Sequence, residues 1–235
     1  MKTVVEKYGP CPPHTRDYLK LLDDTDLMGK GKNLKYDSDA CRRLSTMFAE
    51  TEAKLEVEAV MDLLTNDLFF PLEKMQVSCE MEYRTFFEPN SFSRVLIIGS
   101  GGYPQIALYA FRFDNEISFG AADISPYATV LCSMLAAKLG YEKRLEPFTR
   151  SAVEIEPEII RSYDGFFISS AVKPKNDAIK RILLHKRPNA KIYAREDITH
   201  PDFYELVTIN HPDLLSAREA WEILKRQNGQ AVQPD

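Results

Sequence analysis

The run RVLIIGSGGYPQ, residues 94–105, constrains the fold more than any other stretch of this sequence. Four apolar residues lead directly into Gly99, Gly101 and Gly102. Glycine has no Cβ, so the backbone can turn tightly there and approach a ligand closely. The run therefore predicts a short buried strand, a tight turn and the start of a helix.

Strands and helices are expected to alternate after residue 93. Apolar runs predict strands at residues 95–98, 117–122, 145–149, 165–169, 191–194 and 204–209. Helical patterns are expected at residues 104–111, 126–139, 157–162, 175–185 and 215–225. Alternation of this kind predicts a mostly parallel sheet covered on both faces, with ligands bound beyond the carboxyl ends of the strands. We therefore expect an α/β fold of the Rossmann-like type.

The first part of the chain has a helical pattern without strands. Residues 37–66 place an apolar stripe on one helical face, and shorter helices are expected around residues 15–23 and 80–87. We therefore expect two parts, an N-terminal helical cap or lid at residues 1–92 and a Rossmann-like domain at residues 93–235.

The composition limits the classes of partner expected for this protein. The formal net charge of -5 argues against a nucleic-acid binder, which usually carries a basic stripe. No stretch approaches ~18 consecutive apolar residues, so we expect no membrane span and a cytoplasmic protein. The four cysteines form no C-x-x-C and the four histidines show no ligand spacing, so no metal is expected. The expected partner is a small-molecule substrate; a homodimer is compatible with the sequence.

An acidic residue stands where a ribose would be bound. Asp123 ends the second expected strand, 24 residues after Gly99, and could accept hydrogen bonds from ribose hydroxyls. The glycine run departs from G-x-G-x-x-G, because Pro104 replaces the third glycine. That departure favours a nucleoside without phosphates, such as S-adenosylmethionine (SAM), and so a class I SAM-binding domain. The alternative is that the glycines only make a strand-to-helix turn.

Further binding residues follow from the topology, because loops after neighbouring parallel strands meet at one sheet edge. The candidates for SAM binding are Gly99, Ser100, Gly101, Gly102, Asp123, Ile124, Ser151, Ala152, Ser169 and Ser170. Each serine could equally cap its own loop.

Two segments resemble the SAM-binding half of nicotianamine synthases. They are VLIIGSGGYPQIALYAF…ADISPYATVLCSMLAAKLG and YDGFFISSAV…AIKRILLHKRPNAKIYAREDITHPDFY, within residues 60–212. The resemblance implies chemistry on the 3-amino-3-carboxypropyl arm of SAM, with release of methylthioadenosine. The short azetidine-2-carboxylate synthases are similar in size. In these, the SAM amino group attacks its own Cγ and closes a four-membered ring.

The same resemblance implies catalytic residues in the cap. Residues 69–87, FFPLEKMQVSCEMEYRTFF, resemble the family's F-P-Y-Y-x-N-Y…L-E-Y, which carries its catalytic glutamate. The match assigns that role to Glu82 and places Tyr83 beside it. The family's aromatic pair and asparagine are replaced by Leu72, Glu73 and Met75, which fits a reaction without a second substrate. Glu82 could otherwise be a solvated helix carboxylate.

Other candidates flank the expected sulfonium. Tyr103 follows the glycines and could steady the cation through its ring, or it could be a packing aromatic. Tyr8 and Tyr127 are further candidates of this type. Arg195 aligns with an arginine of the family and could pair with a carboxylate. We count Tyr103 with Glu82 and Tyr83 as the catalytic candidates.

Four functions are compatible with these patterns. The first is azetidine-2-carboxylate synthase, the second an aminobutyryl transferase resembling nicotianamine synthase, and the third a small-molecule methyltransferase. The fourth is a SAM-binding module without activity. Cyclisation requires a neutral amine held close to Cγ, a group that takes or orients the amine proton, and exclusion of water.

Overall fold

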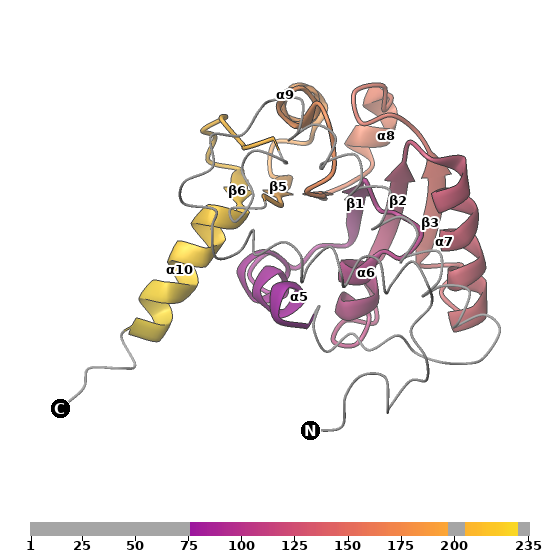
Figure 1. Cartoon of the computed structure of the whole chain (residues 1–235), viewed down its shortest axis with the longest axis horizontal. Coiled ribbons are helices and arrows are strands. Elements are labelled where there is room, and N and C mark those ends of the chain that lie inside the picture. Colours follow the sequence, from indigo (N-terminus) through magenta and orange to yellow (C-terminus); the bar gives the residue numbers. More distant parts are fainter. Residues whose placement is uncertain (1–75, 197–204, 230–235) are drawn as a thin grey trace, which may run out of the picture. The chain divides into compact units, whose positions relative to one another are not determined.

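The computed structural model describes residues 76–196 and 205–229. Within these ranges, six strands form one sheet (Figure 1). The strands are β1 (Arg94–Ile98), β2 (Ser118–Asp123), β3 (Leu145–Thr149), β4 (Gly165–Ile168), β5 (Lys191–Ala194) and β6 (Leu214–Ser216). Their order is β3-β2-β1-β4-β5-β6, and every neighbouring pair is parallel. This order confirms the Rossmann-like fold, and its direction reverses between β1 and β4, where such folds bind ligands.

Helices cover both faces of the sheet. They are α5 (Gln76–Glu82), α6 (Gln105–Ala110), α7 (Pro126–Leu139), α8 (Pro157–Arg161), α9 (Lys175–His185) and α10 (Ala217–Gly229), with a π-helical turn η2 (Tyr83–Phe87) after α5. Along β1, Val95 and Ile97 pack into one buried cluster, while Leu96 and Ile98 pack into the other. The first cluster includes residues of α6 and α7, and the second includes residues of α8 and α9. Alternating apolar side chains therefore explain why these strands are apolar throughout.

Local signals fix the ends of α7 as the sequence predicts. Ser125 precedes the helix, and its hydroxyl accepts a hydrogen bond from the Ala128 N–H at 3.3 Å. Pro126 occupies the first turn, where its missing N–H costs nothing. The helix ends at Gly140, whose φ of 74° is left-handed. The expected helix at residues 126–139 is confirmed.

The expected sixth strand is wrong in position. No strand lies at residues 205–209. The last strand of the described sheet is β6, which begins at Leu214, after the predicted strand ends. The N–H of Val207 donates to Glu196 Oε1 at 2.6 Å, and the N–H of Thr208 donates to Asn176 Oδ1 at 3.0 Å. These backbone donors are bound by side chains, so they are not used in a ladder. The apolar alternation has another cause: Val207 and Ile209 pack against the second cluster.

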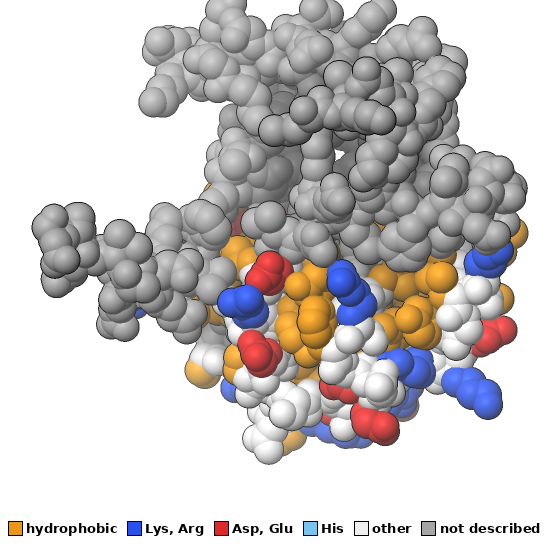
Figure 2. All heavy atoms as spheres, turned by 90° about the horizontal axis from the view of Figure 1, so that it is seen from below, with side chains coloured by type: hydrophobic (Ala, Val, Ile, Leu, Met, Phe, Trp, Pro, Cys, Tyr) orange, Lys and Arg blue, Asp and Glu red, His pale blue; other side chains and the backbone are white. Residues whose placement is uncertain are grey.

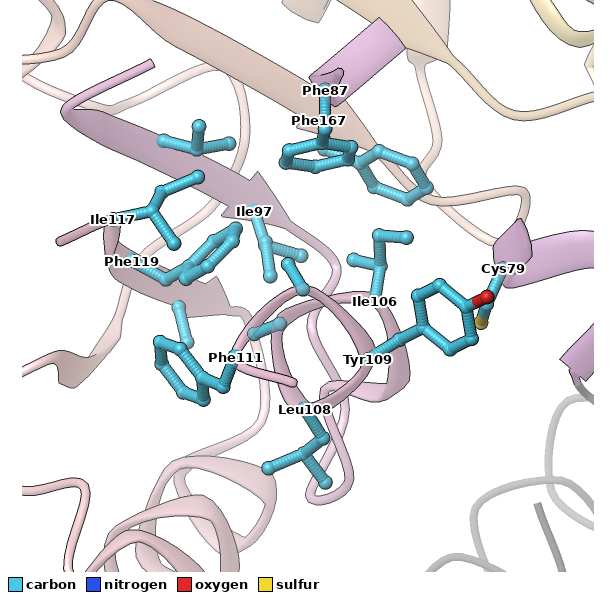
Figure 3. Packing of buried hydrophobic residues seen from close by; sticks show 14 of the residues in the cluster. Cys79, Phe87, Ile97, Ile106, Leu108, Tyr109, Phe111, Ile117, Phe119 and Phe167 are labelled. Carbon is cyan, nitrogen blue, oxygen red and sulfur yellow. The ribbon is translucent and has the colours of Figure 1, made fainter. Parts of the chain in front are cut away.

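The segment before β1 packs directly against the sheet. Phe86 and Phe87 of η2 are buried in the first cluster, and Phe87 lies 6.3 Å from Phe167 of β4 between ring centroids (Figure 3). Phe86 lies 5.5 Å from Tyr193 of β5. The helix expected at residues 80–87 is therefore present as the end of α5 and η2. The cap expected at residues 1–92 stays a prediction, because residues 1–75 lie outside the described ranges.

Candidate functional site

A pocket lies at the carboxyl ends of β1, β4 and β5. Its walls come from the glycine loop, the start of α6 and the residues that end or follow these strands. The lining residues are Ile97, Gly99, Ser100, Tyr103, Pro104, Gln105, Ile106, Phe167, Ser169 and Arg195. The pocket thus stands at the reversal of strand order, where the sequence predicts a ligand.

The glycine loop requires glycine for two reasons. Gly99 and Gly101 have φ values of 72° and 62°, which side chains other than glycine adopt at a cost. A Cβ on Gly99 would also lie 2.6 Å from a methyl carbon of Val172, in the loop after β4. The N–H of Gly99 donates to the Ala122 carbonyl at 2.8 Å, which ties the loop to β2. The loop therefore approaches both neighbouring strands closely.

Asp123 ties the glycine loop to the next turn. One carboxylate oxygen accepts the N–H of Gly101 at 2.9 Å, and the other accepts the N–H of Ser125 at 2.8 Å. Each carboxylate oxygen has a second lone-pair site, so the half-buried group keeps acceptor capacity for a hydroxyl. Ile124 follows it and is 74% exposed.

The structure brings only some of the expected binding residues into the pocket. Gly99, Ser100 and Ser169 line it with Tyr103. The remaining candidates belong to loops at the same sheet edge but are not lining residues: Gly101, Gly102, Asp123, Ile124, Ser151, Ala152 and Ser170. The Ser151 backbone carbonyl accepts the N–H of Glu154 at 2.9 Å, which closes a turn after β3.

Glu82 and Arg195 form a bidentate ion pair beside the pocket. The Arg195 Nε and Nη2 atoms donate to the two carboxylate oxygens of Glu82, each at 2.7 Å. Only 1% of Glu82 is exposed. Burial alone would lower the pKa of Arg195. The charge and hydrogen bonds of the Glu82 carboxylate together outweigh burial and raise this pKa above its ordinary value. Bidentate, charge-assisted pairs of this kind are strong and have a defined geometry.

The secondary structure positions both residues of the ion pair. Glu82 is the last residue of α5, directly before the π-helical turn η2, and π turns are frequent at functional sites. Arg195 follows the last residue of β5, and its guanidinium carbon lies 5.2 Å from the ring centroid of Phe167. The sequence named both residues, but it did not pair them.

Two buried tyrosines carry hydroxyls without hydrogen-bond partners in the described part of the chain. Tyr103 lines the pocket and is 3% exposed. Burial, followed by the Cys79 thiol, raises the pKa of Tyr103 to about 12. Tyr193 of β5 is fully buried, and burial followed by the Glu82 carboxylate raises its pKa well above the usual value. Both groups are neutral phenols at pH 7, able to donate a hydrogen bond.

Tyr83 lies in an aromatic cluster and is not one of the lining residues. Its ring centroid is 5.9 Å from that of Tyr109 and 5.1 Å from that of Phe113, which is half-exposed. Figure 2 shows hydrophobic side chains gathered among charged ones on the lower face, where α5 and α6 lie in Figure 1. Tyr8 lies outside the described residues, and the side chain of Tyr127 is not described.

The sequence analysis missed Lys175 and Tyr193, both buried next to the pocket residues. A tyrosine inside an apolar strand and a lysine after a proline give no local sign of burial beside a site. Within residues 76–196 and 205–229, no three His, Cys, Asp or Glu side chains are placed to hold a metal ion. No helix among the described residues is long and apolar enough to cross a membrane.

Comparisons with known proteins show the fold. No protein-family model matches the sequence, and no curated protein matches it significantly. A glutamate-to-glutamine variant of the nicotianamine synthase MtNAS, in complex with S-adenosylmethionine, has a TM-score of 0.60 and 14% identity over 83% of this chain and 80% of that chain. MtNAS in complex with MTA and tNA has a TM-score of 0.50 and 12% identity over 78% of this chain and 82% of that chain. The chain therefore shares the fold of a protein that has been solved with SAM.

Proposed function

We propose that this protein is a SAM-dependent azetidine-2-carboxylate synthase, in which the amino group of SAM attacks its own Cγ. The observation that carries the proposal is the buried Glu82–Arg195 pair. Arg195 lines the pocket with the glycine loop, so the pair stands beside a ligand bound there. The likeness in fold to MtNAS supports SAM as that ligand.

The proposed placement of SAM extends from the loops after β1 and β2 into the pocket. The adenosine lies against the glycine loop, and Asp123 accepts hydrogen bonds from the ribose hydroxyls. The exposed side chain of Ile124 offers an apolar surface to the adenine ring. The amino-acid arm then extends toward Tyr103 and Arg195, which line the pocket.

Arg195 has donors to spare for the carboxylate of SAM. A guanidinium carries five N–H donors, and two of them are used by Glu82. The remaining donors can bind the SAM carboxylate in the planar geometry that arginine favours. Glu82 keeps two lone-pair sites on its carboxylate, and one of them can accept an N–H of the SAM amine.

The reaction is a single displacement. The neutral amine of SAM donates its lone pair to Cγ, the Cγ–S bond breaks, and its electron pair stays on sulfur as the neutral thioether methylthioadenosine. The ring nitrogen gains a positive charge as the sulfonium loses one. Glu82 orients the amine and can take a proton from it, and the Tyr103 ring faces the sulfonium. Most of the rate enhancement comes from holding nitrogen and Cγ in line.

A transfer reaction is the second candidate, and the likeness to MtNAS favours it. In that case the same arm of SAM passes to the amine of a second substrate instead of closing on itself. The electron pair again stays on methylthioadenosine, so the nucleoside product is the same for both candidates.

A product assay separates the candidates. Purified protein is incubated with SAM alone, and products are identified by mass spectrometry against a control without enzyme, because SAM decays slowly by itself. Enzyme-dependent methylthioadenosine and azetidine-2-carboxylate support the synthase. Turnover only after addition of an amino acid would favour the transferase, and S-adenosylhomocysteine would favour a methyltransferase.

A further inference from the structure

Lys175 is completely buried, which is rare for lysine. It begins α9, after the loop that leaves β4. Its Nζ atom donates to the carbonyl oxygen of Ser170 at 3.0 Å and to that of Arg195 at 2.8 Å. Ser170 follows Ser169, and both Ser169 and Arg195 line the pocket. The Lys175 ammonium therefore links the segment after β4 to the segment after β5.

The Arg195 backbone is thereby held from both sides. Its N–H donates to the carbonyl of Ile168, the last residue of β4, at 2.8 Å. Its carbonyl is bound by Lys175 on the other side. Because the backbone is fixed at both groups, the guanidinium starts from a defined place and reaches Glu82 in bidentate geometry.

The surroundings keep Lys175 in position. Glu205 accepts the backbone N–H of Lys175 at 2.7 Å and that of Asn176 at 3.1 Å. Burial lowers the pKa of Lys175 to about 8, Glu196 and Glu205 oppose this shift, and Lys173 and Arg195 add to it. The side chain is therefore mostly an ammonium at pH 7, with three N–H donors.

We propose that Lys175 is the positioning residue of this site: its ammonium fixes the Arg195 backbone and so aims the guanidinium that holds Glu82. The inference rests on the proposed catalytic role of Glu82. Lys175 itself acts through Arg195 and does not need to touch the substrate. A purely structural role would instead stabilise the fold without affecting the arginine.

The variant Lys175→Met tests this, and Lys186→Met is its matched control. Lys186 is also nearly buried, with 5% of its side chain exposed, but it pairs with Asp213 at 2.9 Å. Asp213 directly precedes β6, at the opposite ends of the strands from the pocket. Both variants remove a buried ammonium, and only one of them touches Arg195.

Four quantities are measured in each variant: the Nε–H resonance of Arg195 by ¹H–¹⁵N NMR, kcat for SAM, KM for SAM, and Tm. In Lys175→Met we expect the Arg195 resonance to shift or broaden and kcat to fall about ten- to a hundredfold, with a smaller change in KM. In Lys186→Met we expect a lower Tm, an unchanged Arg195 resonance and unchanged kcat.

An unchanged Arg195 resonance, or an unchanged kcat, in folded Lys175→Met would overturn the inference. Equal effects in Lys186→Met would also overturn it, because they would report only lost stability. If Lys175→Met does not fold, Lys175→Gln takes its place, because glutamine keeps two N–H donors on a shorter side chain. The Nε–H resonance of Arg195 is then measured in Lys175→Gln. If the wild-type protein does not turn over SAM, the proposed function fails, while the NMR comparison alone decides the role of Lys175.

Discussion

Arg195 donates hydrogen bonds of 2.7 Å to both carboxylate oxygens of Glu82, a residue 113 positions earlier in the chain. The pair joins the end of α5 to the carboxyl end of β5. Glu82 is buried, whereas Arg195 lines the pocket.

Glu82→Gln should slow turnover with little effect on SAM affinity. Glutamine can accept one hydrogen bond from Arg195 but is a poor proton acceptor, so we expect kcat to fall by about a hundredfold. Glu80→Gln is the matched control, since Glu80 lies in the same helix and pairs with Arg84 at the surface. Initial rates and calorimetry measure both effects. Equal rates in the two variants would remove Glu82 from the mechanism.

Gly99→Ala should impair SAM binding, whereas Gly140→Ala should not. Both glycines have similar positive φ values, 72° and 74°. A Cβ at Gly99 would collide with Val172, whereas a Cβ at Gly140 meets no atom within 4 Å. Each variant should lose roughly 1 kcal/mol of unfolding free energy to backbone strain. Only Gly99→Ala should lose SAM affinity as well, and equal affinities would show that the close approach of the loop is unimportant.

Asp123→Ala should weaken SAM binding about tenfold or more, because it removes charged acceptors for both the glycine loop and the ribose. Asp114→Ala is the control. Its carboxylate also accepts two backbone N–H groups, from Glu116 and Ile117, but in the turn before β2. Isothermal calorimetry compares the two. Unchanged affinity in Asp123→Ala would refute the ribose assignment.

Asp213 should contribute to stability in a pH-dependent way. Hydrogen bonds from Lys191 and Lys186 lower its pKa to about 2 in the folded protein, compared with about 3.9 in an unfolded chain. Its contribution is therefore complete above about pH 4 and is lost as the pH falls through about 2. Asp213→Asn should reduce the unfolding free energy by roughly 1–2 kcal/mol at pH 7.

Urea unfolding at several pH values checks this prediction. The difference between Asp213→Asn and the wild-type protein should narrow as the pH approaches 2. A difference that stays constant with pH would show that the ionised carboxylate is not its source. Turnover at pH 7 should be unaffected, because Asp213 lies at the opposite ends of the strands from the pocket.

The central strands were predictable because a buried parallel strand is apolar on both faces. The runs RVLII and GFFI are short and almost entirely apolar, as strands buried on both faces are. The segment at residues 205–209 misled the prediction, because its alternation reflects packing of Val207 and Ile209 beside α9. Its backbone donors bind side chains far away in sequence, which no local pattern reveals.

The site was predictable only where it depends on local geometry. The glycine loop and Asp123 are read from a strand, a turn and the next strand. The Glu82–Arg195 pair joins residues 113 positions apart, and the burial of Lys175 depends on two carbonyls that meet only in the folded sheet. Such long-range contacts leave no spacing in the sequence.

The most direct test of the proposed cyclisation follows the bond itself. SAM labelled with ¹³C at Cγ and ¹⁵N at the amino group is incubated with the enzyme and without any acceptor, and the products are examined by NMR. The proposal predicts enzyme-dependent azetidine-2-carboxylate with a one-bond coupling between the two labels, in equal amount to methylthioadenosine. Methylthioadenosine without this coupling, or SAM that remains intact in the presence of folded enzyme, would contradict it.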